Sequence, residues 1–273
     1  MSADEAPAPP GPSAPAGALE SHLRARRSEG RKLLVPYVTG GMSPDWLEVV
    51  HAVADAGADA IEVGIPFSDP MMDGPTIQEA SVRALALGTT PHALFDALAR
   101  TEVGVPLAVM TYYNVVFRAG HKRFAASLVD AGVAGAIVPD LPLEESVQWR
   151  AEAAAAGIET VLLVAPSTPD DRAAAICAAS RGFVYGIGTM GVTGERALLA
   201  DTAGAAAGRL QSMTDVPVCI GIGVSTPAQA AEVCTLADGV IVGSALVRRL
   251  LDGGGPSAAA AFVGELRAGL DGG

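Results

Sequence analysis

Hydrophobic and polar positions follow one repeating pattern from Leu33 onward. A short apolar or β-branched run is followed by a turn, an Ala-rich amphipathic stretch and another apolar run. Runs of this length and composition are typical of buried β-strands. The eight predicted strands cover residues 34–38, 60–65, 105–110, 135–138, 160–165, 183–187, 216–221 and 239–243.

The stretches between these runs have the period of helices, and several end at a glycine, as at Gly57, Gly132 and Gly157. The predicted helices cover residues 46–56, 91–101, 121–131, 144–156, 170–180, 197–212, 227–235 and 258–270, with one more before the first strand, over about 18–30. Parallel strands joined by helices close into a (β/α)8 TIM barrel when there are eight of them. The alternative, an open doubly wound sheet, usually has fewer strands and one Gly-rich dinucleotide motif, and the sequence has neither.

Composition fits a single barrel over residues 18–273, preceded by a disordered tail, residues 1–17, of Ala, Pro, Ser and Gly. Half of the residues are apolar but only 4% are aromatic, which suits a core of Ala, Val, Leu and Ile. The net charge of −12, without a basic stripe, argues against nucleic acid and against an anionic membrane surface. No apolar run reaches the ~18 residues of a membrane span. The three scattered cysteines, Cys177, Cys219 and Cys234, indicate buried thiols in a reducing cytoplasm.

One carboxylate lies within a predicted strand. Glu62 lies between Ala60 and Gly64 on one face of strand 60–65, whose other face is β-branched. Small neighbours leave a hollow beside the carboxylate, and burial raises the pKa of a glutamate toward values useful for proton transfer. The following loop brings Asp69 and Asp73 to the same strand end. The alternative is a Glu62 tied to backbone amides and two aspartates that cap turns.

Active sites of such barrels lie in the loops after the strands. Tyr112 and Tyr113 follow the third strand and suit a pocket for a flat apolar ligand. The segment 186–194 has four glycines, which is typical of a mobile lid.

Two glycine-rich turns follow the last two strands, where barrels commonly bind phosphate. Gly221 and Gly223 follow the seventh strand, and Gly243 precedes a helix that starts at Ser244. Glycines let backbone N–H groups approach an anion, and the helix dipole adds to the attraction. No lysine lies at a strand end, which argues against a Schiff-base aldolase, and no cluster has metal-ligand spacing. Acid–base chemistry on a phosphorylated substrate remains.

The motifs Glu62-Val-Gly-Ile-Pro-Phe-Ser-Asp-Pro-x-x-Asp73-Gly-Pro, Tyr185 to Gly191-Val-Thr-Gly194, Gly221-x-Gly223 and Gly243-Ser-Ala resemble the α subunit of tryptophan synthase. The resemblance runs from about residue 34 to residue 250 in the family's order and spacing. It implies a (β/α)8 barrel that reversibly cleaves indole-3-glycerol phosphate to indole and glyceraldehyde 3-phosphate. It also implies no cofactor in this subunit and a partner β subunit, carrying pyridoxal phosphate, in an α2β2 heterotetramer.

The resemblance also assigns roles to individual residues. Glu62 is implied to be the acid–base residue, and Asp73 to hold the indole N–H. Tyr185 is implied to lie near Glu62, and Thr193 to be a lid residue that meets Asp73 on closure. The residues implied to bind phosphate through their backbone are Gly194, Gly223, Gly243 and Ser244.

The chain departs from the family pattern at two places. Met42 and Ser43 follow Gly41 where the first loop often reads Gly-Asp-Pro, and Thr189 stands where some members carry Arg. Asp69-Pro70 and Asn114 fall where the family's loops meet the β subunit. Two other functions stay open: a stand-alone lyase that releases indole, and a non-catalytic regulatory barrel, which intact Glu62 and Asp73 disfavour.

Overall fold

The computed structural model describes residues 16–188, 196–221 and 223–272, so the tail predicted over residues 1–17 falls almost wholly outside the described residues. Eight parallel strands form a closed barrel in which each strand pairs with its neighbours in sequence and β1 pairs with β8. The strands are β1 (Leu33–Thr39), β2 (Ile61–Gly64), β3 (Leu107–Met110), β4 (Gly135–Ile137), β5 (Glu159–Val164), β6 (Val184–Ile187), β7 (Val218–Gly221) and β8 (Gly239–Val242). The predicted TIM barrel and all eight predicted strands are confirmed.

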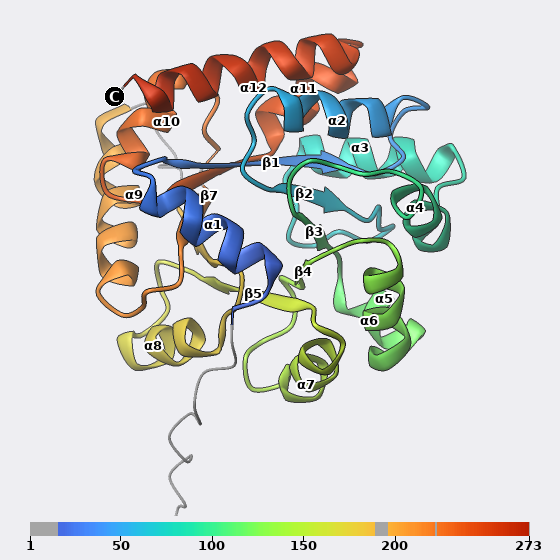
Figure 1. Cartoon of the computed structure of the whole chain (residues 1–273), viewed down its shortest axis with the longest axis horizontal. Coiled ribbons are helices and arrows are strands. Elements are labelled where there is room, and N and C mark those ends of the chain that lie inside the picture. Colours follow the sequence, from blue (N-terminus) through green and yellow to red (C-terminus); the bar gives the residue numbers. More distant parts are fainter. Residues whose placement is uncertain (1–15, 189–195, 222, 273) are drawn as a thin grey trace, which may run out of the picture.

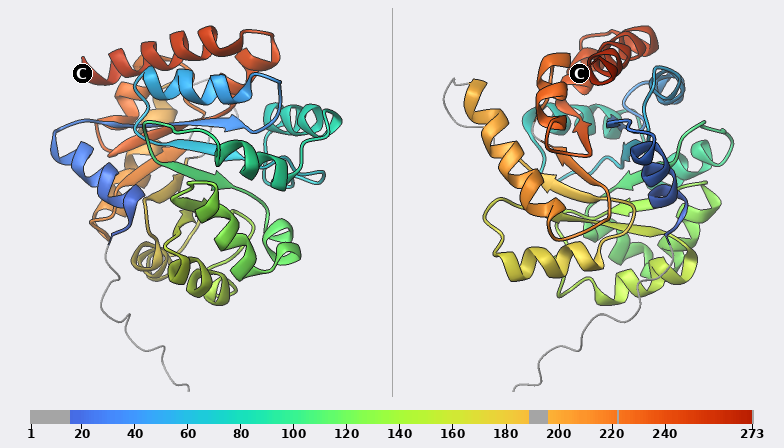
Figure 2. Two further views of the ribbon diagram at one scale, coloured as in Figure 1. Left: turned by 45° about the vertical axis from the view of Figure 1, so that its right-hand side comes forward. Right: turned by 60° about the vertical axis from the view of Figure 1, so that its left-hand side comes forward.

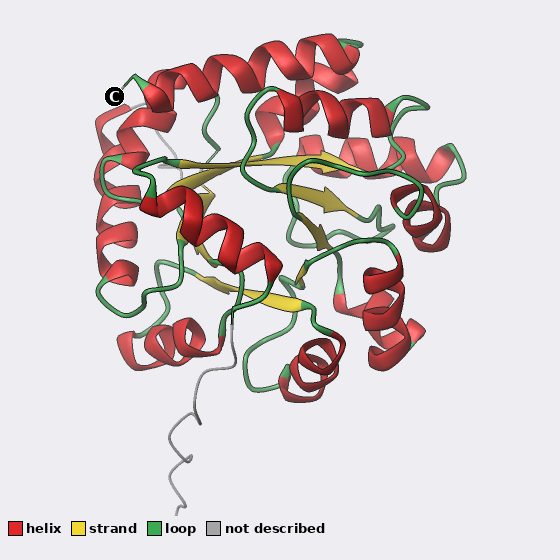
Figure 3. Ribbon diagram, viewed as in Figure 1, coloured by secondary structure: helices red, strands yellow, loops and turns green. Residues whose placement is uncertain are grey.

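Helices surround the barrel on its outside (Figures 1 and 2), and the strands lie enclosed within them (Figure 3). They are α1 (Ala18–Ser28), α2 (Trp46–Asp55), α3 (Pro75–Ala86), α4 (Pro91–Leu98), α5 (Tyr113–Ala119), α6 (His121–Asp130), α7 (Val147–Ala156), α8 (Asp170–Ala179), α9 (Arg196–Gln211), α10 (Pro227–Cys234), α11 (Ser244–Leu251) and α12 (Gly255–Asp271). Each predicted helix is present. Among the described residues, no helix is long and apolar enough to cross a membrane.

Two helices, α3 and α5, were not predicted. Gly74 and Pro75 resemble turn residues, but Gly74 is the extended N-cap of α3 and Pro75 its first residue, where a missing N–H costs nothing. The α5 helix is only seven residues long, too short for a helical period to be recognised.

The alternation along each strand separates two apolar clusters. One fills the barrel interior and includes Val35, Ala60 and Cys219. The other lies between the strands and the helices and includes Ile61, Val63 and Ile65. Since Glu62 alternates with these last three, its side chain is on the inner face of β2, as the pattern predicted.

Helix α1 closes the N-terminal end of the barrel, opposite the loops that follow the strands (Figure 1). Leu19 and Leu23 pack into the interior cluster. The first turn of α1 is capped by a side chain distant in sequence: Glu159 of β5 accepts hydrogen bonds from the N–H groups of Gly17, Leu19 and Glu20 at 3.2, 2.7 and 3.1 Å. A carboxylate at this position satisfies unpaired helix donors and favours the helix dipole.

An ion-pair cluster holds the same end of the barrel together. Asp59, which is buried, accepts a hydrogen bond from the N–H of Leu34 at 2.8 Å. It also pairs with Arg31 Nε at 2.6 Å and with Arg267 Nη1 of α12 at 3.1 Å. Strands β1 and β2 are thereby tied to the last helix of the chain. The loops that follow the strands lie at the opposite, C-terminal end of the barrel.

Candidate active site

Glu62 occupies the inner face of β2 near the C-terminal end of the barrel. The residue is 1% exposed, and neither carboxyl oxygen has a hydrogen-bond partner among the described residues. Burial, with a smaller contribution from the charge of Asp73, raises the pKa of Glu62 to about 8. Over residues 16–188, 196–221 and 223–272, no backbone amide holds this carboxyl, in contrast to the alternative interpretation. A buried, unpaired carboxyl whose pKa is near neutrality is able both to donate and to accept a proton.

Asp73 faces Glu62 from the loop between β2 and α3. Burial raises the pKa of Asp73, and a hydrogen bond with Tyr112 opposes that shift. The Tyr112 hydroxyl also accepts a hydrogen bond from the Met72 N–H at 2.9 Å, and its ring stacks on Phe67 with centroids 5.0 Å apart. Gln78 of α3 donates to the Asp73 carbonyl at 2.8 Å. The loop is thus held from both sides, with an aromatic wall beside the two carboxyls.

Tyr185 enters the same space from β6. A Cβ built at Gly221 of β7 would lie 2.6 Å from the Tyr185 hydroxyl, so glycine is required where the ring leans across the next strand. Burial raises the pKa of Tyr185 well above its usual range, with a further contribution from Glu62. The structure therefore brings together Glu62, Asp73 and Tyr185.

The predicted phosphate-binding turns follow β7 and β8. Gly223 is exposed and has a φ of +77°, a left-handed conformation that favours glycine. Gly243 is the N-cap residue of α11, and Ser244 is exposed at the first position of that helix. The lid residues Thr193 and Gly194, and the departure at Thr189, lie outside the described residues.

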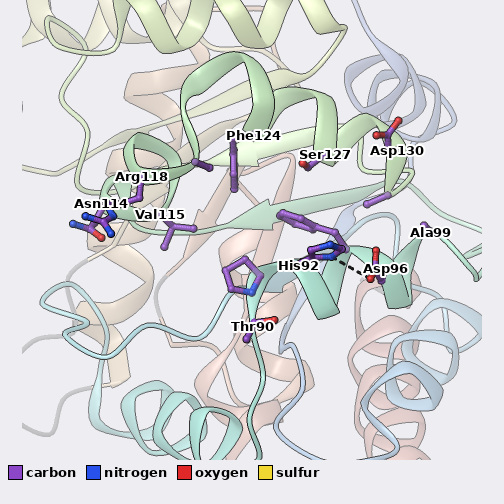
Figure 4. Close-up of a pocket in the computed structure, with 14 residues that line it drawn as sticks. Thr90, His92, Asp96, Ala99, Asn114, Val115, Arg118, Phe124, Ser127 and Asp130 are labelled. Carbon is purple, nitrogen blue, oxygen red and sulfur yellow. Dashed lines mark ion pairs between the residues drawn. The ribbon is translucent and has the colours of Figure 1, made fainter.

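Only part of the loop after β3 faces the mouth. Tyr112 lines it, whereas Tyr113 turns away and its hydroxyl lies 3.0 Å from His121 Nε2. Asn114 borders a separate cavity of about 640 Å³ on the outer surface, between α4, α5 and α6 (Figure 4). None of the barrel-mouth residues lines that cavity. Met42, one of the two departures in the first loop, is buried in the outer apolar cluster.

The chemistry available at the mouth is that of carboxyls, phenols and backbone amides. Over residues 16–188, 196–221 and 223–272, no group of three or more His, Cys, Asp or Glu side chains is arranged to hold a metal ion. One residue of the mouth, Tyr37 of β1, was missed by the sequence analysis, because nothing in an apolar strand distinguishes it before the register with β2 is known.

Comparison with known proteins places this geometry in context. The family model described as tryptophan synthase alpha chain matches residues 23–262. The tryptophan synthase alpha chain of Streptomyces avermitilis is 46% identical over 263 residues, which cover 93% of this chain and 95% of that one. That of Streptomyces coelicolor is 48% identical over 238 residues, covering 86% and 88%.

Solved structures agree with these sequence relatives. A structure of tryptophan synthase from Mycobacterium tuberculosis superimposes with a TM-score of 0.86 at 41% identity, covering 94% of this chain and 99% of that one. The tryptophan synthase subunit alpha of Legionella pneumophila superimposes with a TM-score of 0.85 at 30% identity, covering 94% and 100%.

The burial of Glu62 predicts how stability depends on pH. Its pKa is about 8 in the folded protein and near 4.5 when solvated, so the folded state holds a proton that the unfolded chain releases. The free energy of unfolding should therefore fall as pH rises between these two values, by about 1.4 kcal/mol for each increase of one in pH. Urea denaturation measures this free energy at about pH 5 and about pH 8.5. Between these two pH values, the free energy of unfolding of Glu62→Gln should rise by more than about 2 kcal/mol relative to that of the wild type. Substitution of the exposed Glu145 by Gln serves as the control. If the free energy of unfolding changes with pH by the same amount in all three proteins, the burial of an unpaired carboxyl is contradicted.

Proposed function

The chain belongs to the tryptophan synthase alpha chain family, a family of lyases, and we propose that it reversibly cleaves indole-3-glycerol phosphate to indole and glyceraldehyde 3-phosphate in tryptophan biosynthesis. The observation that carries the proposal is the Glu62 carboxyl, which is buried, lies near the charge of Asp73 and has no partner in the part of the chain that the structure describes. A regulatory barrel without catalysis has no need to keep a carboxyl in such an unfavourable environment.

Glu62 is proposed to move both protons of the cleavage. One proton is delivered to indole C3, and one is taken from the hydroxyl on the adjacent glycerol carbon. The electron pair of that O–H bond forms the aldehyde carbonyl, and the carbon–carbon bond breaks toward the protonated ring. The two transfers balance, so the carboxyl returns to its starting state. A pKa of about 8 keeps both forms of the carboxyl accessible near neutrality.

Asp73 and the aromatic wall are proposed to hold the indole ring. Protonation at C3 places positive charge on the ring nitrogen, and a carboxylate that accepts a hydrogen bond from the N–H stabilises that charge. The stacked rings of Phe67 and Tyr112 offer a flat apolar surface beside Asp73. Tyr185 lies close enough to Glu62 for the charge of that carboxyl to raise the pKa of the phenol.

The phosphate group is proposed to bind at the turns after β7 and β8, through backbone N–H groups of Gly223, Gly243 and Ser244. The space over Gly243 supports this role, because the three nearest described atoms to a Cβ there belong to the Tyr37 side chain, at 3.5 Å or more. The glycine is therefore not required by packing, and the dipole of α11 points its positive end at the same space. Thr193 and Gly194 keep the lid and phosphate roles that the family resemblance gives them.

A β subunit is the proposed partner, and pyridoxal phosphate belongs to that subunit rather than to this one. Large apolar side chains are exposed on the loop after β2 and on α5: Met71 is 90% exposed, Met72 56% and Phe117 66%. They are close in sequence to Asp69-Pro70 and Asn114. Large exposed apolar side chains are common in protein interfaces. The buried free thiols Cys177, Cys219 and Cys234 suit the proposed cytoplasmic location.

Loss of the Glu62 carboxylate tests the acid–base role. Glu62→Gln keeps the volume of the side chain but neither donates nor accepts a proton at this step, so cleavage should slow by at least about 100-fold. Release of glyceraldehyde 3-phosphate would be followed in a coupled assay, with Glu145→Gln as the matched control. A Glu62→Gln enzyme that retains more than about a tenth of wild-type activity contradicts the assignment.

A charge at Gly243 tests the phosphate site. Gly243→Asp places a carboxylate where the phosphate is proposed to lie, so the affinity for glyceraldehyde 3-phosphate should fall by more than about tenfold. Indole has no phosphate, and its affinity should change little. Calorimetric titration of both ligands measures this difference, and unchanged binding of glyceraldehyde 3-phosphate would rule out the site.

Turnover with and without a β subunit tests the partner. A partner that favours the closed, water-excluded mouth should raise the rate of cleavage at least about tenfold, the effect of about 1.4 kcal/mol of differential binding. The rate would be measured while purified β subunit is titrated into the chain. A fast isolated chain on which the β subunit has no effect instead indicates the stand-alone lyase.

A further inference from the structure

Tyr37 lies inside the barrel next to the catalytic strand. Leu33 and Val35 of β1 belong to the interior cluster, and Tyr37 is the next residue on the same face. In the parallel register between β1 and β2, Tyr37 is the direct partner of Glu62. The residue is 7% exposed. Its phenol therefore lies beside the carboxyl, within the mouth.

The Tyr37 side chain reaches from the proposed phosphate site to the strand of Glu62. The base of its ring adjoins Gly243, since a Cβ built there would lie 3.5 Å from Tyr37 Cβ and 3.8 Å from its Cγ. At its other end, the hydroxyl occupies the place that a Cβ at Gly64 would take. Gly64 lies two residues after Glu62 on the same face of β2. The phenol thus spans the distance between the two ends of the substrate.

The part of the substrate between those two ends is the glycerol chain. Its phosphate is proposed to lie at Gly243, and its reacting carbon at Glu62. The carbon between them carries a hydroxyl group. A phenol has one O–H to donate and lone pairs to accept, so it matches this hydroxyl. Burial raises the pKa of Tyr37, a hydrogen bond with Thr39 opposes that shift, and the charges of Asp73 and Glu62 raise the pKa further, so the phenol keeps its proton.

We propose that the Tyr37 hydroxyl hydrogen-bonds the middle hydroxyl of the glycerol chain and so determines specificity for a hydroxylated substrate. This inference rests on the proposed function and extends it to the part of the substrate between the reacting carbon and the phosphate. Tyr185 leans over Gly221 in a similar way, but among the described residues it is Tyr37 whose atoms lie nearest to a Cβ built at Gly243. Gly64 is part of the arrangement, because any larger residue there displaces the phenol.

The test compares a hydroxylated ligand with one that lacks hydroxyls. Tyr37→Phe keeps the ring and removes only the oxygen. Cleavage of indole-3-glycerol phosphate should fall about tenfold in kcat/KM, since a site that pairs a substrate hydroxyl loses that pairing. The affinity for the phosphate ester of 3-(indol-3-yl)propan-1-ol, which has the same ring, chain length and phosphate, should stay within about twofold. Tyr113→Phe, which removes a hydroxyl outside the mouth, should behave as the wild type.

Each other outcome overturns a definite statement. If Tyr37→Phe keeps wild-type kcat/KM, the hydroxyl has no role and the inference fails alone. If kcat/KM for indole-3-glycerol phosphate and the affinity for the hydroxyl-free ester fall by the same factor, the phenol only shapes the phosphate site, and the inference again fails. Thermal unfolding of each variant identifies a loss that comes from instability. A wild-type chain that does not cleave indole-3-glycerol phosphate overturns the proposed function, and this inference with it.

Discussion

The burial of one carboxyl group, that of Glu62, is the constraint on which the rest of the mouth depends. A carboxyl removed from water without a partner resists ionisation, and the described residues around it are those that tolerate it: small Ala60 and Gly64 along the same face, and the phenols of Tyr37 and Tyr185 rather than cations. If an arginine were paired with Glu62, the pKa of the Glu62 carboxyl would fall and that carboxyl would stay ionised. The site therefore depends as much on which charges are kept away as on which residues are present.

The two ends of the barrel differ in how their buried carboxyl groups are held. At the N-terminal end, Asp59 is paired with Arg31 and Arg267, although His22 Nε2 and Arg267 Nε are buried there without partners among the described residues. At the C-terminal end, both carboxyl oxygens of Glu62 are buried without partners among the described residues. Unpaired buried groups destabilise a fold, so the first end offsets what the second costs.

The sequence was sufficient to predict every strand, because the apolar runs and the glycines between them repeat with a clear period. It also placed Glu62 on the inner face, since alternation decides which way each side chain of a strand points. It did not predict α3, where Gly74 and Pro75 suit a turn and a helix start equally well. Tyr37 was not predicted either, because its proximity to Glu62 comes from the pairing of two strands, which no local pattern encodes.

The contact between Glu159 and α1 has a consequence for the order in which the molecule is made. The residues that this carboxylate caps precede it by about 140 positions, so the first helix leaves the ribosome long before its cap exists. Until the fifth strand is synthesised, Leu19 and Leu23 of α1 have no complete barrel interior to pack against. The first helix is thus among the last elements to take its final place, and a nascent chain halted before Glu159 leaves Leu19 and Leu23 exposed on an otherwise polar helix.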